Sequence, residues 1–112
     1  MSVYVVQNHS SYNSEAGIME PRFDLSPAEK FGELVYLLPP IAVPNRPKEI
    51  IHKLQEKLSN FSDQDYLLLI GNPCFIGWVT AIAAKANRGK VKMLQWNGRR
   101  KQYYEISATG LI

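Results

Sequence analysis

Short apolar runs rich in β-branched and aromatic residues recur along the chain, separated by polar or proline-rich segments. Such runs predict strands, because branched and aromatic side chains pack well on a pleated surface. The run at 65–71 shows no alternation of apolar and polar residues, which is typical of a central strand covered on both faces. The predicted strands are 2–7, 33–38, 65–71, 90–96 and 101–106.

Two segments carry the spacing of helices. In the first, apolar residues from Ile50 to Phe61 recur mostly at intervals of three and four, which places them on one face of a helix. Asn45 is the predicted cap of this helix. The second helix, 73–86, is apolar on nearly all sides, and Asn72 is its predicted cap.

The order of these elements predicts an α/β fold in a single compact domain, residues 1–112. Its sheet has about five strands and is mixed: helical crossovers give a parallel core, and the last two strands form an antiparallel hairpin. Asn97-Gly98 predicts a tight turn with positive φ in that hairpin. The polar segment around 8–22 has no periodicity and is predicted to be a mobile loop. The pattern leaves open whether the two long helices share one face of the sheet.

Composition excludes several classes of protein. The 112 residues are 46% hydrophobic and 21% charged, which rules out disorder of the whole chain. Cys74 is the single cysteine, so neither a disulfide framework nor a cysteine zinc site is expected. The longest apolar stretch, 66–84, is broken by glycine and proline, and residues 1–7 lack the pattern of an export signal. We therefore expect no membrane span and a reducing cytoplasm.

Charge is distributed unevenly along the chain. The net charge is +3, from 13 basic and 10 acidic residues. Up to Ala84 the chain has six basic and nine acidic residues, whereas from Lys85 onward seven basic residues accompany only Glu105. This cationic C-terminal quarter predicts a polyanionic or acidic partner.

The basic residues of the C-terminal quarter are interleaved with aromatic residues along the predicted hairpin. On a β-ribbon, cations can contact phosphates and aromatic faces can stack on bases. An acidic protein surface would suit the same cations, and lysines on an edge strand also serve simply to prevent aggregation. The candidate residues for contact with a partner or nucleic acid are Lys85, Arg88, Lys90, Lys92, Trp96, Arg99, Arg100, Lys101 and Tyr103.

Several pieces of the sequence carry a resemblance to a known family. They include Leu37-Leu38-Pro39-Pro40, Asp65-Tyr66-Leu67-Leu68-Leu69-Ile70-Gly71-Asn72-Pro73, Asn87-Arg88-Gly89 and Trp96. Over about three quarters of its length, from Phe23 to Glu105, the chain resembles a family of small proteins of tailed bacteriophages. The resemblance implies a viral protein that acts inside the host, and it carries over no activity and no catalytic residue. Asn72 is a departure, because the family has an acidic residue after the glycine.

The corner formed by Gly71, Asn72 and Cys74 is a candidate site for an anion or ligand. Free N–H groups and the helix dipole attract anions at the start of a helix. The known phosphate-binding fingerprints have more glycines than this corner, and Pro73 removes one donor. A capped helix start without a ligand is therefore the alternative.

No arrangement of residues points to catalysis. Cys74 lies in a predicted first helical turn, but a nucleophilic cysteine needs a base, and the chain has only His9 and His52. Asp63 and Asp65 fit a turn in which aspartates bond to backbone groups. We expect no catalytic residue, no metal and no cofactor.

These observations give three hypotheses on function. The first is a non-enzymatic phage accessory protein that binds a host or viral protein in the host cytoplasm. The second is a nucleic-acid-binding protein that uses the basic hairpin, and the third is a binder of nucleotide or phosphate at 71–74. A homodimer, formed through a sheet edge or a helix face, is possible in each case.

Overall fold

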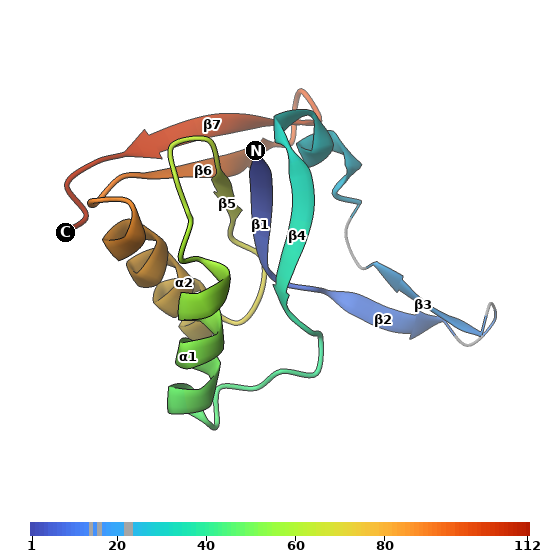
Figure 1. Ribbon diagram of the computed structural model, residues 1–112. Coiled ribbons are helices and arrows are strands. Elements are labelled where there is room, and N and C mark those ends of the chain that lie inside the picture. Colours follow the sequence, from blue (N-terminus) through green and yellow to red (C-terminus); the bar gives the residue numbers. More distant parts are fainter. Residues whose placement is uncertain (14, 16, 22–23) are drawn as a thin grey trace.

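The computed structural model describes residues 1–13, 15, 17–21 and 24–112 (Figure 1). The strands are β1 (Ser2–Gln7), β2 (Ser10–Asn13), β3 (Ile18–Pro21), β4 (Glu33–Leu38), β5 (Tyr66–Leu68), β6 (Val91–Asn97) and β7 (Gln102–Ala108). The helices are the 3-10 helix η1 (Ser26–Phe31) and the α-helices α1 (Pro47–Lys57) and α2 (Pro73–Ala86). None of the helices described is long and apolar enough to cross a membrane.

Five strands form one mixed sheet in the order β4-β1-β5-β6-β7. The first four strands are parallel and β7 runs antiparallel to β6, which confirms the predicted α/β fold and its C-terminal hairpin. The chain moves from β1 to β4 on one side, and then returns through α1 to β5 on the other side. This reversal creates a topological switch point at the carboxyl ends of β1 and β5, where open α/β sheets commonly bind ligands.

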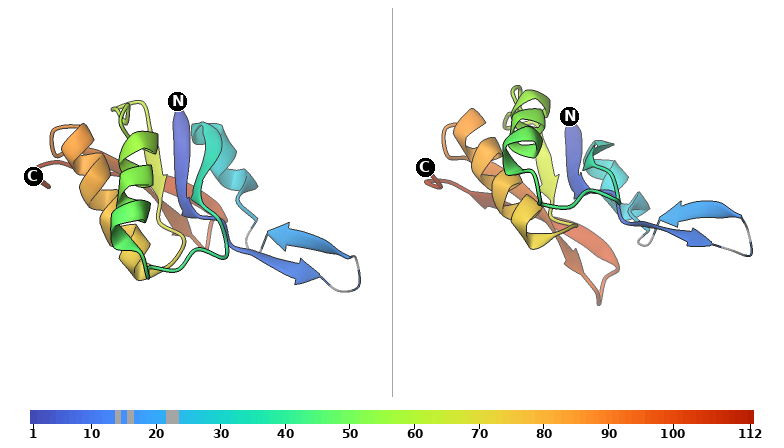
Figure 2. Two further views of the ribbon diagram at one scale, coloured as in Figure 1. Left: turned by 60° about the horizontal axis from the view of Figure 1, so that its bottom comes forward. Right: turned by 90° about the horizontal axis from the view of Figure 1, so that it is seen from below.

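Both long helices lie side by side on one face of the sheet (Figures 1 and 2). Leu54 of α1 and Leu58, which directly follows α1, are fully buried there with Phe75 and Val79 of α2, against Leu67 of β5. The sequence pattern left this arrangement open, because a helix with one apolar stripe fits either face of a sheet.

The opposite face of the sheet is thinly covered. In the part of the chain that the structure describes, η1 and its flanks pack on this face, with Leu25 and Ala28 in contact with a cluster that contains Val3, Val5 and Tyr66. A single 3-10 helix therefore stands in the place that a long helix takes in a larger doubly wound domain.

The segment predicted as a loop around 8–22 contains two strands instead. β2 and β3 pair antiparallel with each other and form a separate two-stranded sheet. The hairpin extends away from the five-stranded sheet (Figures 1 and 2). Its polar sequence offers no alternation of apolar residues, so the usual signal for a strand is absent. Residues 14, 16 and 22 of the predicted loop lie outside the residues described.

Two local predictions need correction. The hairpin between β6 and β7 does not have a two-residue turn at Asn97-Gly98, because Asn97 pairs with Gln102 and the loop comprises residues 98–101. The positive φ falls on Lys101, at 54°. The start of α1 is also different: its first flanking residue is Arg46 rather than Asn45, and no side chain caps it.

Candidate functional site

The sheet divides at the carboxyl end of β5. β5 ends at Leu68, whereas β6 continues to Asn97, and the two strands are in register at Leu67 and Met93. Beyond that pair, among the strands that the structure describes, β6 has only β7 beside it in the sheet, so the two strands continue as a ribbon. A gap in the sheet therefore opens between the end of β5 and the C-terminal half of β6.

Gly71 turns the chain away from the sheet at this point. Its φ is +139°, and a Cβ atom built on it would lie 2.6 Å from Cβ of Gln7. Only glycine fits here, because an added side chain would meet both an unfavourable backbone conformation and a collision with β1. Gly71 thus allows the segment after β5 to pass close to the end of β1.

A cleft of about 920 Å³ occupies the region between this segment and the ribbon. Its walls are mainly apolar, with a few polar side chains at the rim, and it lies at the carboxyl ends of β5 and β6. The lining residues are His9, Asp24, Pro27, Leu68, Leu69, Ile70, Gly71, Met93, Leu94, Gln95, Trp96, Lys101, Tyr103 and Ile106. The size and the mixture of walls are those of a small-molecule site.

Gln7 links three chain segments next to Gly71, which lines the cleft. Its amide nitrogen donates to the carbonyl oxygens of Pro39 at 3.2 Å and Ala42 at 3.1 Å, and its amide oxygen accepts from the N–H of Asn72 at 3.0 Å. The side chain is 5% exposed. One buried amide therefore links the end of β1, the loop after β4 and the start of α2.

Asp24, Trp96 and Tyr103 supply the distinctive chemistry of the cleft. The Asp24 carboxylate accepts a hydrogen bond from the N–H of Ser26 at 3.0 Å, and this bond lowers the pKa of the carboxyl group. Burial, and then the charge of Asp24, raise the pKa of Tyr103. The rings of Trp96 and Tyr103 meet edge to face with centroids 4.9 Å apart, and Trp96 remains 40% exposed. The cleft thus contains a carboxylate, a protonated phenol and an accessible indole.

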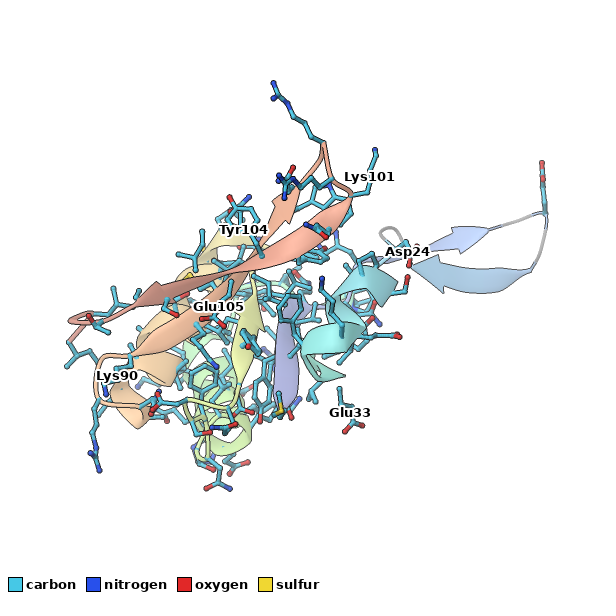
Figure 3. The ribbon with its side chains drawn as sticks, turned by 90° about the horizontal axis from the view of Figure 1, so that it is seen from above. Asp24, Glu33, Lys90, Lys101, Tyr104 and Glu105 are labelled. Carbon is cyan, nitrogen blue, oxygen red and sulfur yellow. The ribbon has the colours of Figure 1, made fainter. Side chains whose placement is uncertain are left out.

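The turn of the ribbon presents three adjacent cations, Arg99, Arg100 and Lys101, which we call the basic tip. Figure 3 labels Lys101 at this turn. The side-chain oxygen of Asn97 accepts from the N–H groups of Arg99 at 3.1 Å and Arg100 at 3.2 Å, which fixes the backbone of the turn. All three cations are exposed, and none forms an ion pair within the part of the chain that the structure describes. The basic tip adjoins the cleft, since Lys101 also lines it.

The structure separates the basic residues that the sequence places in one patch. Lys85, Arg88 and Lys90 lie at the other end of the ribbon from the basic tip, as the labels of Lys90 and Lys101 in Figure 3 show. The seven residues of β6 place the two groups about 20 Å apart. The two groups therefore form separate surfaces.

Lys92 belongs to neither group. Its ammonium lies 4.3 Å from the centre of the Tyr66 ring, and the Tyr66 hydroxyl donates to Glu105 at 3.1 Å. These three side chains form a row across β5, β6 and β7. Lys92 is half-buried and contacts Tyr66, which sets it apart from both groups.

The family model described as Phage Pam3 gp32-like protein matches residues 1–109. The chain belongs to this family of phage proteins. No curated protein and no solved structure matches it. The family confirms the resemblance to phage proteins that the sequence motifs indicated.

The corner at residues 71–74 of this phage protein is a capped helix start. The side chain of Asn72 accepts from the N–H of Cys74 at 2.8 Å, and the N–H of Asn72 is bonded to Gln7. Pro73 has no N–H group. Most of the donors that would hold an anion are therefore in use, and the geometry favours the interpretation without a ligand.

The side chains considered for catalysis or metal binding lie apart from one another. Cys74 is exposed in the first turn of α2, whereas His52 is paired with Glu56 at 3.0 Å on the exposed side of α1. Asp65 accepts from the N–H groups of Ser2 and Ser62, as expected for an aspartate that fixes a turn. Among the residues described, no group of three or more His, Cys, Asp or Glu side chains is placed to hold a metal.

Sequence reasoning missed most of the cleft. Asp24, Gln95 and the carboxyl end of β5 were not among the candidates, because residues from five separate stretches of the chain form the cleft only after the sheet is assembled. One signal was present: an apolar strand that ends in Gly71 marks the carboxyl edge of a parallel sheet, where ligand sites occur.

Proposed function

We propose that this phage protein is a non-enzymatic binding module that holds single-stranded nucleic acid inside the host cell by the basic tip. The observation that carries the proposal is the group of three adjacent exposed cations, unpaired with carboxylates among the residues described. Polyanion backbones bind such groups because each phosphate contact releases condensed counterions.

Trp96 favours a single strand over a duplex as the partner. Trp96 is 40% exposed and lies on β6, next to the turn that carries the cations. Bases can stack on an exposed aromatic ring only when their faces are free, as in a single strand. A cationic turn beside an exposed indole therefore matches a strand whose phosphates and bases are both accessible.

The rigidity of the turn supports the proposal further. The two bonds to Asn97 hold the main chain of Arg99 and Arg100 in place before any partner binds. A turn held in this way loses less conformational entropy on binding than a free loop would.

The test is the binding of fluorescent DNA and RNA oligonucleotides over a range of salt concentrations. The variant R99Q/R100Q/K101N removes the basic tip, and asparagine suits the positive φ of Lys101. We expect at least ten-fold weaker binding at moderate salt, with the slope of log affinity against log salt reduced by about 2.

The matched control is K85Q/R88N/K90Q, which removes the same number of charges at the other end of the ribbon. Arg88 also has a positive φ, of 59°, so the two variants carry the same backbone risk. Equal losses in both variants, or no binding by the unmodified protein, would contradict the proposal.

A protein partner is the second candidate, and β7 favours it. This strand forms one edge of the sheet, and its Tyr104 and Ile106 are 46% and 43% exposed. An exposed edge with apolar side chains can receive a strand from a host protein, a viral protein or a second copy of this chain.

Affinity capture with the unmodified protein and with I106K tests this second function. Loss of a specific partner in I106K supports it. Partners that are the same for both proteins, with a monomer throughout in sedimentation, would argue against it.

A further inference from the structure

We propose that the cleft beside the basic tip is a pocket for one nucleobase that carries an exocyclic amino group, guanine above all, with its phosphate directed to Lys101. The inference deepens the proposed function and rests on it for the phosphate contacts. The nucleotide can be free or part of a strand, and the experiment below separates these sources.

The position and size of the cleft suit a small ligand. It lies at the carboxyl ends of parallel strands, next to the point where the chain reverses its direction across the sheet. Its volume of about 920 Å³ is within the range of ligand pockets. The gap exists because the β5–β6 ladder stops early, so it is a consequence of the strand lengths and is present without a ligand.

The walls suit a flat ring. Leu68, Ile70 and Leu94 provide apolar surface, and Trp96 and Tyr103 add aromatic rings. A planar heterocycle gains apolar burial from the first group and stacking from the exposed indole. A flexible aliphatic chain could bury the same area but would gain no stacking.

Asp24 selects among planar rings. One of its oxygens is held by the N–H of Ser26, and the pKa of the carboxyl group is lowered by that bond, so the group is ionised at neutral pH. An ionised carboxylate only accepts hydrogen bonds, so the ring it recognises must donate. Guanine offers an adjacent imino and amino donor pair, adenine and cytosine offer one amino group, and uracil and thymine offer no amino group.

The positive charge of Lys101 favours a ligand that also carries an anionic group. Lys101 lines the cleft and continues into the exposed Arg99 and Arg100. A base held near Asp24 with a phosphate near Lys101 satisfies both charges of the site. A nucleotide therefore fits better than a nucleoside or a simple aromatic acid, which would leave one charge uncompensated.

Isothermal titration calorimetry of the full chain with GMP, IMP and UMP tests the inference. IMP differs from GMP only in lacking the 2-amino group. We expect GMP to bind at least five-fold more tightly than IMP, and UMP to bind most weakly, as for the loss of a well-placed hydrogen bond to a base. The variant D24N should remove the difference between GMP and IMP, since Asn keeps an acceptor for Ser26 but presents donors to the base.

E33Q is the matched control for D24N. Glu33 is exposed at the start of β4, away from the cleft (Figure 3), and its substitution removes the same charge. The thermal midpoint of each variant verifies that it folds. If D24N and E33Q discriminate between GMP and IMP to the same extent, or if none of the three nucleotides binds and the strands below show no preference, the inference is overturned.

A decamer of thymidines with one central guanine, compared with the all-thymidine decamer, separates the two sources of the base. Preference for the guanine decamer without binding of GMP assigns the pocket to bases within a strand. Binding of GMP without binding of either decamer supports the pocket and contradicts the proposed function. Equal binding of the two decamers, with no binding of GMP, supports the proposed function and contradicts the pocket.

Discussion

Gln7 shows how one side chain can link several segments beside the candidate site. Its amide is buried and both donates and accepts, so it meets carbonyl oxygens on one side and the N–H of Asn72 on the other. We expect Q7E to reduce the free energy of unfolding by about 2 kcal/mol or more, because a carboxylate would oppose the carbonyl oxygens of Pro39 and Ala42. Urea unfolding at neutral pH measures the effect. The control Q55E makes the same change on the exposed side of α1 and should stay within about 0.5 kcal/mol. Equal effects would mean that the Gln7 network contributes nothing specific.

Two glycines give opposite predictions for the same substitution. At Gly71, alanine combines a φ of +139° with a contact of 2.6 Å to Gln7, so G71A should lower stability by about 2 kcal/mol or more. At Gly77, which lies inside α2 with no atom within 4 Å of an added Cβ, alanine should raise stability by about 1 kcal/mol. Thermal unfolding of both variants measures the difference. A stable G71A protein would show that the segment after β5 can move, which would weaken the description of the cleft as preformed.

The turn between β6 and β7 depends on the side chain of Asn97. N97A removes the acceptor for the N–H groups of Arg99 and Arg100 and should lower stability by about 1 kcal/mol. Oligonucleotide binding should weaken as well, although every positive charge remains, because the cations lose their fixed backbone. N45A is the control, since no side chain caps α1. If N97A binds as tightly as the unmodified protein, the order of the turn has no part in binding.

The row formed by Tyr66, Lys92 and Glu105 across β5, β6 and β7 predicts how stability depends on pH. Hydrogen bonds from Ser107 and then Tyr66 lower the pKa of Glu105, and Lys92 adds to this effect. Because the folded-state pKa is the lower one, the stabilisation is present above the unfolded pKa and is lost as the pH falls through the folded one. S107A should shift the pKa of Glu105 upward toward its ordinary value, which carboxyl NMR titration can follow. An unchanged titration in S107A would show that the serine bond does not act on this group.

The long elements were predictable because each is determined by its own sequence. The apolar stripe of α1, the cap and proline that begin α2, and the branched residues of β1 act over a few neighbouring positions. The β2–β3 hairpin has no such signal. The turn at 98–101 depends on hydrogen bonds that the side-chain oxygen of Asn97 accepts from the N–H groups of Arg99 and Arg100, and these bonds compete with the tight turn that Asn97-Gly98 favours. The basic tip could be named from the sequence, but its separation from Lys85 and Lys90 follows from the length of β6.

For the molecule as a whole, the cleft shows what sequence patterns leave out. It exists because β5 has three residues and β6 has seven, so β6 continues where its parallel neighbour has ended. Asp24 lines it from the segment just before η1, on the face opposite the long helices, while Lys101 lines it from the last hairpin. No local pattern joins these segments, since their proximity is a property of the assembled sheet. The carboxyl edge could be anticipated from topology, whereas the identity of its polar residues could not.

The two sheets of the molecule should differ strongly in stability. β2 and β3 share no ladder with the five-stranded sheet, and an isolated two-stranded hairpin is only marginally stable in water. By contrast, β1 lies between β4 and β5, and its Val3 and Val5 are fully buried. Hydrogen exchange measured by mass spectrometry should therefore be complete within seconds at 10–13 and 18–21, and slower by several orders of magnitude at 3–6.

Repeating the measurement at two protein concentrations tests for self-association through the β2–β3 hairpin. If β2 and β3 are as well protected as β1 at both concentrations, the five-stranded sheet stabilises the hairpin and the prediction is wrong. Protection that grows with concentration would instead identify the hairpin as a contact between copies.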